Sequence, residues 1–313
     1  MSTETDQATG QVTTGSAVAG TADGPVRYAE PRARLRPKVA EFVKHAVLIA
    51  FALSVILPLL WVFLLSIKTL PDSVQSYIWP QHGFDFTHYF YAWQNIPTLP
   101  RNMLNSVVVT LATVVITTIA AVLGGYALVH LRTPGRALVL AALVASLFFP
   151  VRITGIIGVW EVQRNLGLLN TTWGLILPYV GALPSLALGI FVMRGIFESI
   201  PSELAQAARV DGAGPWTTLR HIMLPLVRNG VIVVVLFTFV LAWGEYLMAA
   251  TLTNDAEVRT LPLVLAHATG GMGQWAWPRI AAVYVIAILP AFIVFAFTQR
   301  RYIEGLQEGA LKE

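Results

Sequence analysis

The chain contains no cysteine, and only 12% of its 313 residues are charged. Without cysteine it can form no disulfide framework and perform no thiolate chemistry. Soluble domains carry about 25% charged residues, so this low charge content excludes an ordinary soluble fold. Apolar residues take the place of charge, because 56% of the chain is hydrophobic and the mean hydropathy is +0.65. We therefore predict a polytopic membrane protein.

Lysine is also scarce, and its placement excludes an ATPase within this chain. The only lysines are Lys38, Lys44, Lys68 and Lys312, and none follows a glycine. A phosphate-binding loop ends in Gly-Lys-Ser/Thr, with the lysine on the phosphates. If the protein's activity depends on ATP, another chain must bind the nucleotide.

Patterns for catalysis and metal binding are missing as well. The six histidines are scattered without metal-ligand spacing, and no Ser-His-Asp arrangement is suggested. The net charge of +4 comes largely from loop arginines, which indicates membrane topology rather than nucleic-acid binding. We expect a non-catalytic protein with no metal or cofactor of its own, whose surroundings are the lipid bilayer.

The N-terminal residues 1–44 are predicted to form a cytoplasmic tail. Residues 1–26 are rich in Thr, Ser, Gly and Ala, a composition typical of disorder. They do not form a signal peptide, because the first apolar run begins only near His45 and lacks a small-residue cleavage site. Residues 27–44 carry six basic side chains, and such a flank keeps the N-terminus in the cytoplasm.

The apolar runs are continuous rather than alternating, which favours membrane helices over barrel strands. Six runs are long enough for the roughly 20 residues that a bilayer requires. They are 45–67, 105–130, 137–158, 173–196, 230–252 and 279–299. We expect Pro58 to break the first span, and Pro178 and Pro184 to kink the fourth. The fold class is therefore all-α, with a six-helix transmembrane domain over 45–300 and a C-tail over 301–313.

Lysine and arginine counts predict the orientation of these spans. With the N-terminus inside, fifteen of the 21 basic residues fall in cytoplasmic segments and six on the other side. Both termini and the loop 198–228 are therefore predicted to be cytoplasmic. The segments 68–104 and 254–278 are then external, and the aromatic-rich 68–104 is either a cap that meets a soluble partner or an interfacial belt.

The loop 198–228 contains the longest polar island in the second half of the chain. Pro201 suits a first helical turn, and Glu203 adds negative charge where the helix dipole favours it. Asp211 and Gly212 are predicted to end this helix, since glycine adopts the left-handed cap conformation at little cost. A second short helix is expected to start at Gly214-Pro215 and to end at Leu224-Pro225.

The spacing in this loop resembles the EAA signature of permease subunits from bacterial binding-protein-dependent ABC importers. Its flanks resemble the carbohydrate, maltose-type branch. The matching residues, in order, are Ala207, Ala208, Gly212, Ile222, Leu224 and Pro225. Gln206 departs from the pattern, because the family usually has glutamate there. The alternative interpretation is an ordinary amphipathic cytoplasmic hairpin.

The resemblance covers residues 45–313 and implies a type I ABC importer permease whose loop is the coupling helix that docks on the ATPase. It also implies four kinds of partner in a bacterial inner membrane: a second homologous permease, an ATP-binding cassette ATPase dimer that binds ATP and magnesium, an extracytoplasmic sugar-binding protein, and lipid. With Gln206 neutral, we expect docking to rest on the alanine surface and the turn, with Glu203 or Asp211 as the ionic contact.

Glu245 is the most informative charge within the predicted spans, and an intramembrane ionisable residue suggests a functional site. Its context with Trp243 and Tyr246 resembles the aromatic-flanked acidic segment of the family. The functional interpretation is a contact with a sugar hydroxyl or a gate-forming hydrogen bond. The structural alternative is a buried pair with Arg152, which could instead extend to the interface.

The predicted external loop 254–278 could contact the binding protein. In maltose-type permeases the corresponding loop can enter the binding protein and help displace sugar. Here glycines give reach and tryptophan suits sugar stacking. The candidate residues are Gly270, Gly271, Met272, Gly273 and Trp275. The alternative is a solvated hairpin.

The sequence therefore predicts the permease subunit of an ATP-driven sugar importer. A first alternative is the same machine for a polyamine, phosphate or amino acid. A second is a secondary transporter, which predicts internal repeats and paired intramembrane charges. A third is a membrane enzyme or scaffold, which predicts a cluster of catalytic polar residues at one depth.

Overall fold

The computed structural model describes residues 38–75, 78–148, 155–182, 184–270 and 275–310. Over these residues the chain is helical, and the single strand-like feature described is an isolated bridge between Lys68 and Phe84. The predicted all-α fold is thus confirmed. The chain divides into two units, Met1–Ser54 and Val55–Glu313, which are treated separately. The predicted disordered segment 1–26 and Arg152 lie outside the described residues.

The helical elements follow one another closely along the chain. They are α1 (Lys38–Ser66), α2 (Leu70–Val74), α3 (Thr87–Asn95), α4 (Leu99–His130), α5 (Arg136–Phe148), α6 (Ile156–Asn165), α7 (Thr172–Ala182), α8 (Ser185–Ser199), α9 (Ser202–Val210), α10 (Pro215–Thr218), the π-helical η1 (Leu219–Met223), α11 (Leu224–Leu226), α12 (Arg228–Trp243), α13 (Leu247–Leu252), α14 (Leu261–Gly270) and α15 (Trp277–Ala310).

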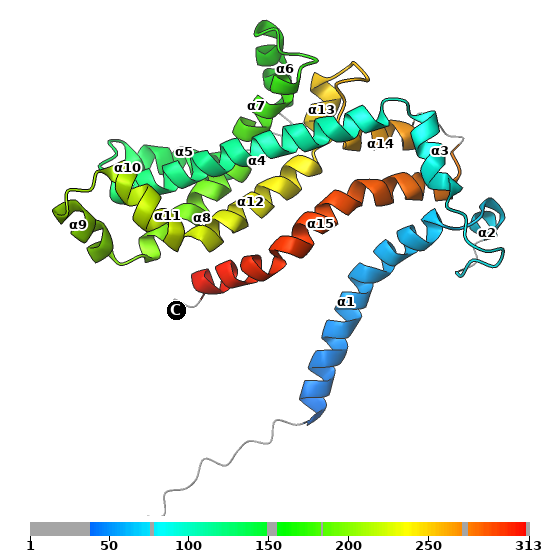
Figure 1. Ribbon diagram of the computed structural model, residues 1–313, viewed down its shortest axis with the longest axis horizontal. Coiled ribbons are helices and arrows are strands. Elements are labelled where there is room, and N and C mark those ends of the chain that lie inside the picture. Colours follow the sequence, from blue (N-terminus) through cyan, green and yellow to red (C-terminus); the bar gives the residue numbers. More distant parts are fainter. Residues whose placement is uncertain (1–37, 76–77, 149–154, 183, 271–274, 311–313) are drawn as a thin grey trace, which may run out of the picture. The chain divides into compact units, whose positions relative to one another are not determined.

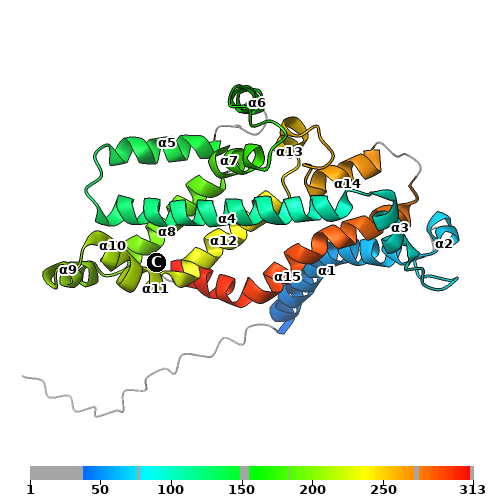
Figure 2. The ribbon, with the colours of Figure 1, turned by 45° about the horizontal axis from the view of Figure 1, so that its top comes forward.

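α4 is the helix around which the second unit packs, and it contacts α7, α8, α12 and α14. Figures 1 and 2 show it running between two ends of this unit, with α9 and α10 at one end and α3 and α14 at the other. Three apolar clusters bury its sides, one near each end and one between them. α4 therefore connects the end of the unit that holds α9 and α10 to the end that holds α3 and α14.

Small residues let α4, α8 and α12 approach closely. A Cβ added to Gly125 would lie 2.7 Å from the Cβ of Met193 on α8. A Cβ on Gly189 would lie 3.0 Å from Ala121 of α4 and 3.1 Å from Val234 of α12. Van der Waals packing of this kind drives helix association in lipid.

A layer of buried hydroxyl groups adjoins this contact. Thr117, Ser185 and Thr238 lie four residues from Ala121, Gly189 and Val234, one helical turn along α4, α8 and α12 respectively. All three side chains are fully buried, and none of the three hydroxyls has a hydrogen-bond partner among the described residues. An unsatisfied buried group costs about 1–3 kcal/mol, so this layer is less stable than its apolar neighbour.

The predicted spans correspond to long helices or to bent pairs of helices. Within the described residues, Glu41–Ser66, Leu99–His130 and Trp277–Gln299 are each long and apolar enough to cross a membrane. Two further candidates are bent: α7 with α8, by 46°, and Pro215–Leu226 with α12, by 81°. The third predicted span, 137–158, corresponds to the 13-residue α5, the undescribed residues 149–154 and the start of α6.

Three sequence expectations about the spans were wrong in detail. Pro58 lies inside a continuous 29-residue α1, because the loss of one hydrogen bond does not end so long a helix. Pro178 also lies within an unbroken α7, whereas Pro184 precedes α8 at the observed bend. The predicted fifth span, 230–252, is interrupted after Trp243. The amide of Gly244 still donates to the carbonyl of Val240, four residues back, but the amide of Glu245 donates to the carbonyl of Ala242, only three residues back, and so leaves the α-helical pattern.

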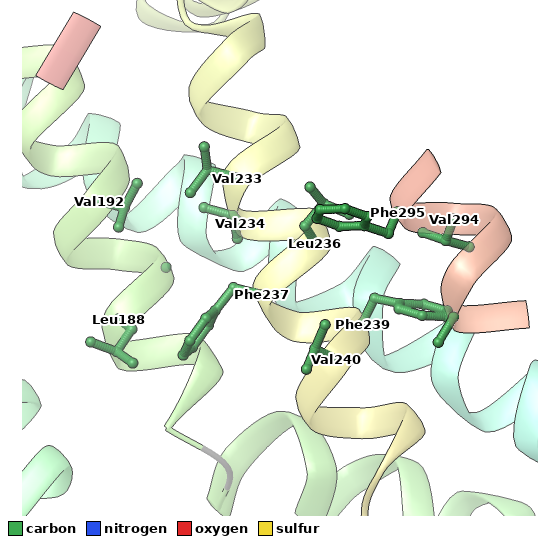
Figure 3. Close-up of a pocket in the computed structure, with 12 residues that line it drawn as sticks. Leu188, Val192, Val233, Val234, Leu236, Phe237, Phe239, Val240, Val294 and Phe295 are labelled. Carbon is green, nitrogen blue, oxygen red and sulfur yellow. The ribbon is translucent and has the colours of Figure 1, made fainter. Parts of the chain in front are cut away.

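An apolar groove of about 390 Å³ runs between α8, α12 and α15. Figure 3 shows valine, leucine and phenylalanine side chains from these helices around it, including Leu188, Phe237 and Phe295. Its lining contains no polar side chain. The groove therefore offers no hydrogen bonds to a hydroxylated solute, and an apolar neighbour such as a lipid tail or another helix suits it better.

The adjacent Gly124 and Gly125 provide a matched test of the α4–α8 contact. Gly125→Ala should lower stability by about 1–3 kcal/mol relative to Gly124→Ala, because its Cβ would meet the backbone nitrogen of Arg194 at 2.9 Å. At Gly124 the nearest atoms belong to the flexible side chain of Ile190, at 3.2 Å. Thermal unfolding of the two variants in nanodiscs measures the difference, and equal unfolding temperatures would contradict the contact.

Candidate functional site

The polar loop predicted from the sequence forms a hairpin of helices, Ser202–Leu226, at one end of the second unit. Its first helix, α9, buries both Ala205 and Ala208, and Ala205 belongs to the apolar cluster that includes the ends of α4 and α8. Glu203 lies exposed in the first turn. Pro201 caps the helix from outside, with extended backbone, rather than occupying its first turn as expected. The three-residue spacing of the two alanines places them on one face.

The turn after α9 confirms the predicted stop signal. Gly212 has a φ of +79°, in the left-handed region that glycine adopts without strain. Its amide donates to the carbonyl of Arg209 at 3.1 Å, and the amide of Ala213 donates to the carbonyl of Ala208 at 2.9 Å. This pair of hydrogen bonds is a Schellman motif, which satisfies the last carbonyl groups of the helix.

The second helix of the hairpin does not end at Leu224-Pro225, as the sequence predicted. It starts at Pro215, passes through the π-helical turn Leu219–Met223 and continues to Leu226. The amide of Leu224 donates to the carbonyl of Leu219, five residues back. Pro225 has no amide hydrogen, so it could not complete an ordinary α-helical ladder. A π turn next to the proline is the observed solution, and the 81° bend follows it.

Two side-chain hydrogen bonds fasten this hairpin to the bundle. The hydroxyl of Tyr126, near the end of α4, donates to the carbonyl of Pro215 at 3.0 Å. Arg209 of α9 donates through Nη2 to the carbonyl of His130, the last residue of α4, at 2.9 Å. The Phe197 ring packs edge-on against Tyr126, with ring centroids 5.7 Å apart. The hairpin is therefore held in a fixed orientation on α4 and α8.

Sequence analysis did not identify these fastening residues. Arg209 entered only as one basic residue in the charge count, and Tyr126 as part of an apolar run. No local pattern marks a tyrosine whose partner lies 89 residues away along the chain. Their role follows only from the packing of α4 beside the hairpin.

Exposure separates the predicted coupling residues into two groups. The exposed residues are Glu203, Gln206, Ala207, Asp211, Gly212, Leu224 and Pro225. Ala208 is buried and Ile222 is half-buried, so the expected alanine surface consists of Ala207 alone. The Gln206 amide makes a long contact, 3.4 Å, with the hydroxyl of Ser202.

The exposed face of the hairpin also carries large apolar side chains that sequence analysis did not single out. Val210 is 87% exposed, Trp216 is 64% exposed and Leu204 is 42% exposed. Apolar side chains grouped on an otherwise polar surface typically mark a site of protein contact. We define the hairpin face as these three residues together with Ala207.

Glu245 lies in the break between α12 and α13, not within a continuous helix. It is buried, and its Oε1 accepts a hydrogen bond from the amide of Met248 at 3.0 Å. The carboxylate thus satisfies a free amide at the start of α13. The hydroxyl of Tyr179 donates to the backbone carbonyl of Glu245 at 3.4 Å. The predicted pairing with Arg152 stays a prediction, because Arg152 lies outside the described residues.

The aromatic residues beside Glu245 face different surroundings. Trp243 is buried, stacks on Phe239 with centroids 5.7 Å apart, and donates through Nε1 to the carbonyl of Ala287 on α15 at 3.1 Å. Tyr246 is 44% exposed. The structure does not bring the predicted pathway residues together at one surface, and their role in transport stays a prediction.

The loop after α13 is fastened to the start of α4 by asparagine side chains. Asn102 donates to the carbonyls of Ala256 and Arg259, at 2.8 and 2.9 Å. Asn105 donates to the carbonyls of Glu257 and Arg259, at 2.7 and 3.1 Å. These contacts, absent from the sequence prediction, satisfy loop carbonyls that have no helical partner.

The predicted binding-protein loop is described only in part. Gly270 ends α14, whereas Gly271, Met272 and Gly273 lie outside the described residues. Trp275 packs edge-on against Tyr91 of α3, with ring centroids 5.1 Å apart. Its aromatic ring therefore contributes to packing between α3 and the segment before α15, and the proposed contact with a binding protein stays a prediction.

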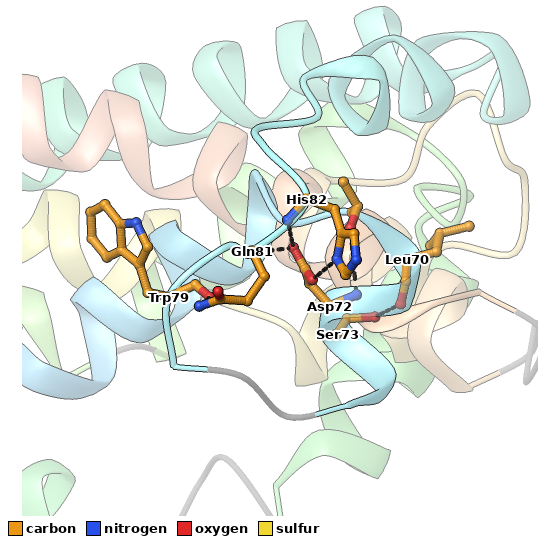
Figure 4. Close-up of polar contacts among 7 residues, drawn as sticks. Leu70, Asp72, Ser73, Trp79, Gln81 and His82 are labelled. Carbon is orange, nitrogen blue, oxygen red and sulfur yellow. Dashed lines mark hydrogen bonds and ion pairs between the residues drawn. The ribbon is translucent and has the colours of Figure 1, made fainter.

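The α2–α3 segment, residues 67–96, is organised around a buried carboxylate. Figure 4 shows Asp72 facing His82, with the backbone of residues 81 and 82 wrapped around it. Its Oδ2 accepts hydrogen bonds from the amides of Gln81 and His82, at 3.0 and 3.1 Å. Its Oδ1 lies 2.5 Å from Nδ1 of His82. Burial raises the pKa of Asp72, but the hydrogen bonds from His82 and Gln81 outweigh burial and lower the pKa overall.

A buried lysine lies beside this carboxylate. The ammonium group of Lys68 sits over the ring of Trp61, 4.1 Å from its centroid. Burial lowers the pKa of Lys68, and the nearby charge of Asp72 partly offsets that shift. The aromatic-rich segment is thus a folded element.

Among the residues that the structure describes, no three histidine, aspartate or glutamate side chains are grouped as metal ligands.

The comparisons with known proteins agree with the sequence resemblance. A sequence model of the family described as "Binding-protein-dependent transport system inner membrane component" matches residues 38–306. The diacetylchitobiose uptake system permease protein of Streptomyces coelicolor is 31% identical over 86% of this chain and 88% of its own length. The trehalose transport system permease protein of Mycobacterium tuberculosis is 32% identical, over 82% of this chain and 92% of its own length.

Solved structures show the same fold. A chain of a bacterial ABC transporter involved in import of the acidic polysaccharide alginate aligns with a TM-score of 0.72 and 24% identity. The alignment covers 84% of this chain and 96% of that one. A chain from an alginate transporter in complex with an alginate pentasaccharide-bound periplasmic protein aligns with a TM-score of 0.58 and 14% identity, over 84% of this chain and 93% of that one. The predicted permease architecture is confirmed.

The turn of the hairpin can be tested with two neighbouring glycines. Gly212→Ala should destabilise the end of α9 by about 1 kcal/mol, because alanine is strained at a φ of +79°. Gly214→Ala is the matched control, since its φ is −70° and an added Cβ would meet no atom within 4 Å. Hydrogen exchange of the α9 amides measures the effect, and equal exchange in both variants would contradict the assigned turn.

The Asp72 network predicts a dependence of local stability on pH. Because the pKa of Asp72 is lower in the folded segment than its ordinary value of 3.8, its ionised form stabilises the fold above that value. This contribution is lost as the pH falls through the lowered pKa. Asp72→Asn should therefore speed exchange of the Gln81 and His82 amides about tenfold or more at pH 6. Wild type should approach that rate only below pH 3.8.

Asp211→Asn is the control for this experiment, because Asp211 is exposed on the hairpin at the other end of the unit. It should leave the exchange of Gln81 and His82 unchanged after correction for intrinsic rates. Equal protection in Asp72→Asn and wild type at pH 6 would show that the carboxylate does not organise the segment.

Proposed function

This chain belongs to the family of binding-protein-dependent transport system inner membrane components, and we propose that it is the membrane-spanning subunit of an ATP-driven importer for a sugar or oligosaccharide. The observation that supports the coupling part of this proposal is the hairpin face. It presents Val210 and Trp216 outward while Tyr126 and Arg209 fasten the hairpin to α4. A partner that moved this face would therefore move α4.

The partner at the hairpin face is a separate ATPase dimer, which binds ATP and magnesium. The four lysines of this chain include none in a phosphate-binding loop, so the nucleotide must be bound elsewhere. The apolar residues of the hairpin face supply contact area, and Glu203 or Asp211 supplies the ionic contact in place of the glutamate that Gln206 replaces. The distribution of basic residues along the sequence favours a cytoplasmic hairpin and two cytoplasmic termini.

The other partners lie within and outside the membrane. A second, homologous permease completes the translocation pathway, and an extracytoplasmic binding protein delivers the substrate at the α3 and α14 end. The chain itself performs no covalent chemistry. Saccharide substrates are favoured because the relatives named above are permeases for diacetylchitobiose and trehalose.

A non-sugar solute is the second candidate, supported by one group of relatives. An sn-glycerol-3-phosphate transport system permease protein of Brucella abortus is 32% identical, over 67% of this chain and 73% of its own length. Uptake assays with radiolabelled saccharides and with glycerol-3-phosphate distinguish the two, and ATP-driven uptake of glycerol-3-phosphate alone would replace the sugar assignment.

Two exposed valines at opposite ends of the unit test the docking surface. Val210→Glu should reduce co-purification of the ATPase at least tenfold and abolish ATP-driven uptake into proteoliposomes, because the interface would bury an unpaired charge. Val74→Glu is the matched control, since Val74 is 82% exposed on α2 and Val210 is 87% exposed. If Val210→Glu co-purifies with the ATPase as well as wild type does, the hairpin face is not the docking surface.

The same co-purification assay tests the ionic contact. Charge reversal at both Glu203 and Asp211 should weaken ATPase assembly by a smaller factor than Val210→Glu, because exposed ion pairs are individually weak. Assembly and transport that remain intact in the doubly reversed variant would refute the ionic contact and leave the apolar contact in place.

A further inference from the structure

A polar cavity of about 490 Å³ lies at the end of the second unit opposite the hairpin. Its walls come from the α2–α3 segment and from the first turn of α15. The polar and aromatic side chains that line it are Asp85, Thr87, His88, Phe90, Tyr91, Gln94 and Arg279, and Leu70 completes the lining. Its volume falls within the range of about 300–1,000 Å³ typical of pockets for small ligands. The cavity is thus large enough for a sugar residue.

One wall carries an ionised carboxylate that is already oriented. Oδ1 of Asp85 accepts hydrogen bonds from the amide and the hydroxyl of Thr87, at 2.9 and 2.6 Å. These bonds lower the pKa of Asp85, so the group stays charged at neutral pH. Its Oδ2 lies 3.5 Å from Nε2 of the buried His88. The carboxylate is therefore a fixed hydrogen-bond acceptor.

The opposite charge comes from Arg279. Its guanidinium lies over the ring of Tyr91, 3.8 Å from the centroid, which fixes the plane of the group. Its Nε is buried and has no hydrogen-bond partner among the residues that the structure describes. Because this nitrogen is shielded from solvent, a ligand in the cavity would meet the other nitrogens of the guanidinium, which are donors only.

The hydrogen-bonding groups on the cavity walls determine which class of ligand the cavity can bind. Asp85 only accepts, Arg279 only donates, and the exposed amide of Gln94 does both. An anion would face Asp85 and a cation would face Arg279, so a ligand that carries charge of only one sign meets one like charge. A hydroxyl group donates and accepts at once, and neighbouring hydroxyls can satisfy both walls.

We propose that this cavity binds one or two residues of an uncharged saccharide at the end of the subunit where substrate is delivered. The inference rests on the proposed import of sugar for its biological meaning, but the binding itself does not require the ATPase. The site is separate from Glu245, whose carboxylate is engaged at the start of α13. It would hold sugar near the mouth of the subunit before the sugar enters the pathway.

The test measures saccharide binding to the full chain in nanodiscs by ligand-observed NMR. Glucose, trehalose and N,N′-diacetylchitobiose are the uncharged probes, and glucuronate is the charged comparison. Gln94→Ala should weaken binding of the best uncharged probe about fivefold, because one hydrogen bond to the ligand is lost. Arg279→Gln should weaken it about tenfold or more, because a charged donor is removed.

Gln81→Ala is the matched control, since Gln81 is also an exposed glutamine of the α2–α3 segment but does not line the cavity. It should bind like wild type. Thermal unfolding shows whether each variant is folded. If Arg279→Gln does not fold, Gln94→Ala still tests the site, because Gln94 is exposed. Failure of all three uncharged probes to bind, or equal binding by Gln94→Ala and Gln81→Ala, would overturn the proposal. Glucuronate binding more tightly than glucose would overturn the uncharged class.

Failure of this site and failure of the proposed function give different results. Saccharide binding that depends on Gln94, without any ATP-driven uptake, would support the saccharide site and contradict the proposed import function. ATP-driven saccharide uptake by a chain that binds no probe in the absence of its partners would contradict the saccharide site and support the proposed import function.

Discussion

Gly125 and Gly189 bring the backbones of α4 and α8 into direct contact, and the remaining helices of the second unit are arranged around that contact. Helices in lipid gain little from the hydrophobic effect between them, so close packing must supply the attraction. α12 joins the same contact through Val234, which lies against Gly189. Once these three helices are fixed, the end of α4 lies beside the hairpin, where Tyr126 can reach Pro215.

The two ends of α4 show different solutions to one problem, the pairing of backbone groups outside regular helices. At one end, the hairpin satisfies its own carbonyls through the Schellman motif, accepts one side-chain hydrogen bond from Tyr126 and donates another through Arg209 to the carbonyl of His130. At the other end, Asn102 and Asn105 hold the loop that follows α13. Both ends are therefore fastened to α4 by side chains, and the loop after α13 adds hydrogen bonds of its own and others to Asn170.

The features predicted correctly from sequence are those that a few adjacent residues determine. The turn at Gly212 was predicted because a left-handed residue is a local requirement, and the all-α fold because apolar runs need no long-range information. The interruption after Trp243 was missed, since it depends on a carboxylate at Glu245 that pairs with a following amide. Val210 and Trp216 were overlooked because an apolar residue in a polar loop reveals its exposure only when the loop is folded.

The candidate site shows the same division. Family spacing identified the hairpin, but the split between exposed Ala207 and buried Ala208 depends on the face that α9 turns toward the bundle. The polar cavity was not predicted at all, because Asp85 and Arg279 are far apart in sequence and neither belongs to a motif. Tertiary packing of α3 against the start of α15, rather than local propensity, brings the two charged side chains to one cavity.

The π-helical turn Leu219–Met223 has a mechanical consequence. A π turn closes its hydrogen bond over one residue more than an α turn, so the turn contains one residue that α-helical pairing would place in the next turn. With α-helical pairing, that residue would rotate the preceding part of the hairpin by about 100° about its axis. Because Pro225 cannot complete such pairing, the π turn fixes the helical register, and with it the direction in which Trp216 faces.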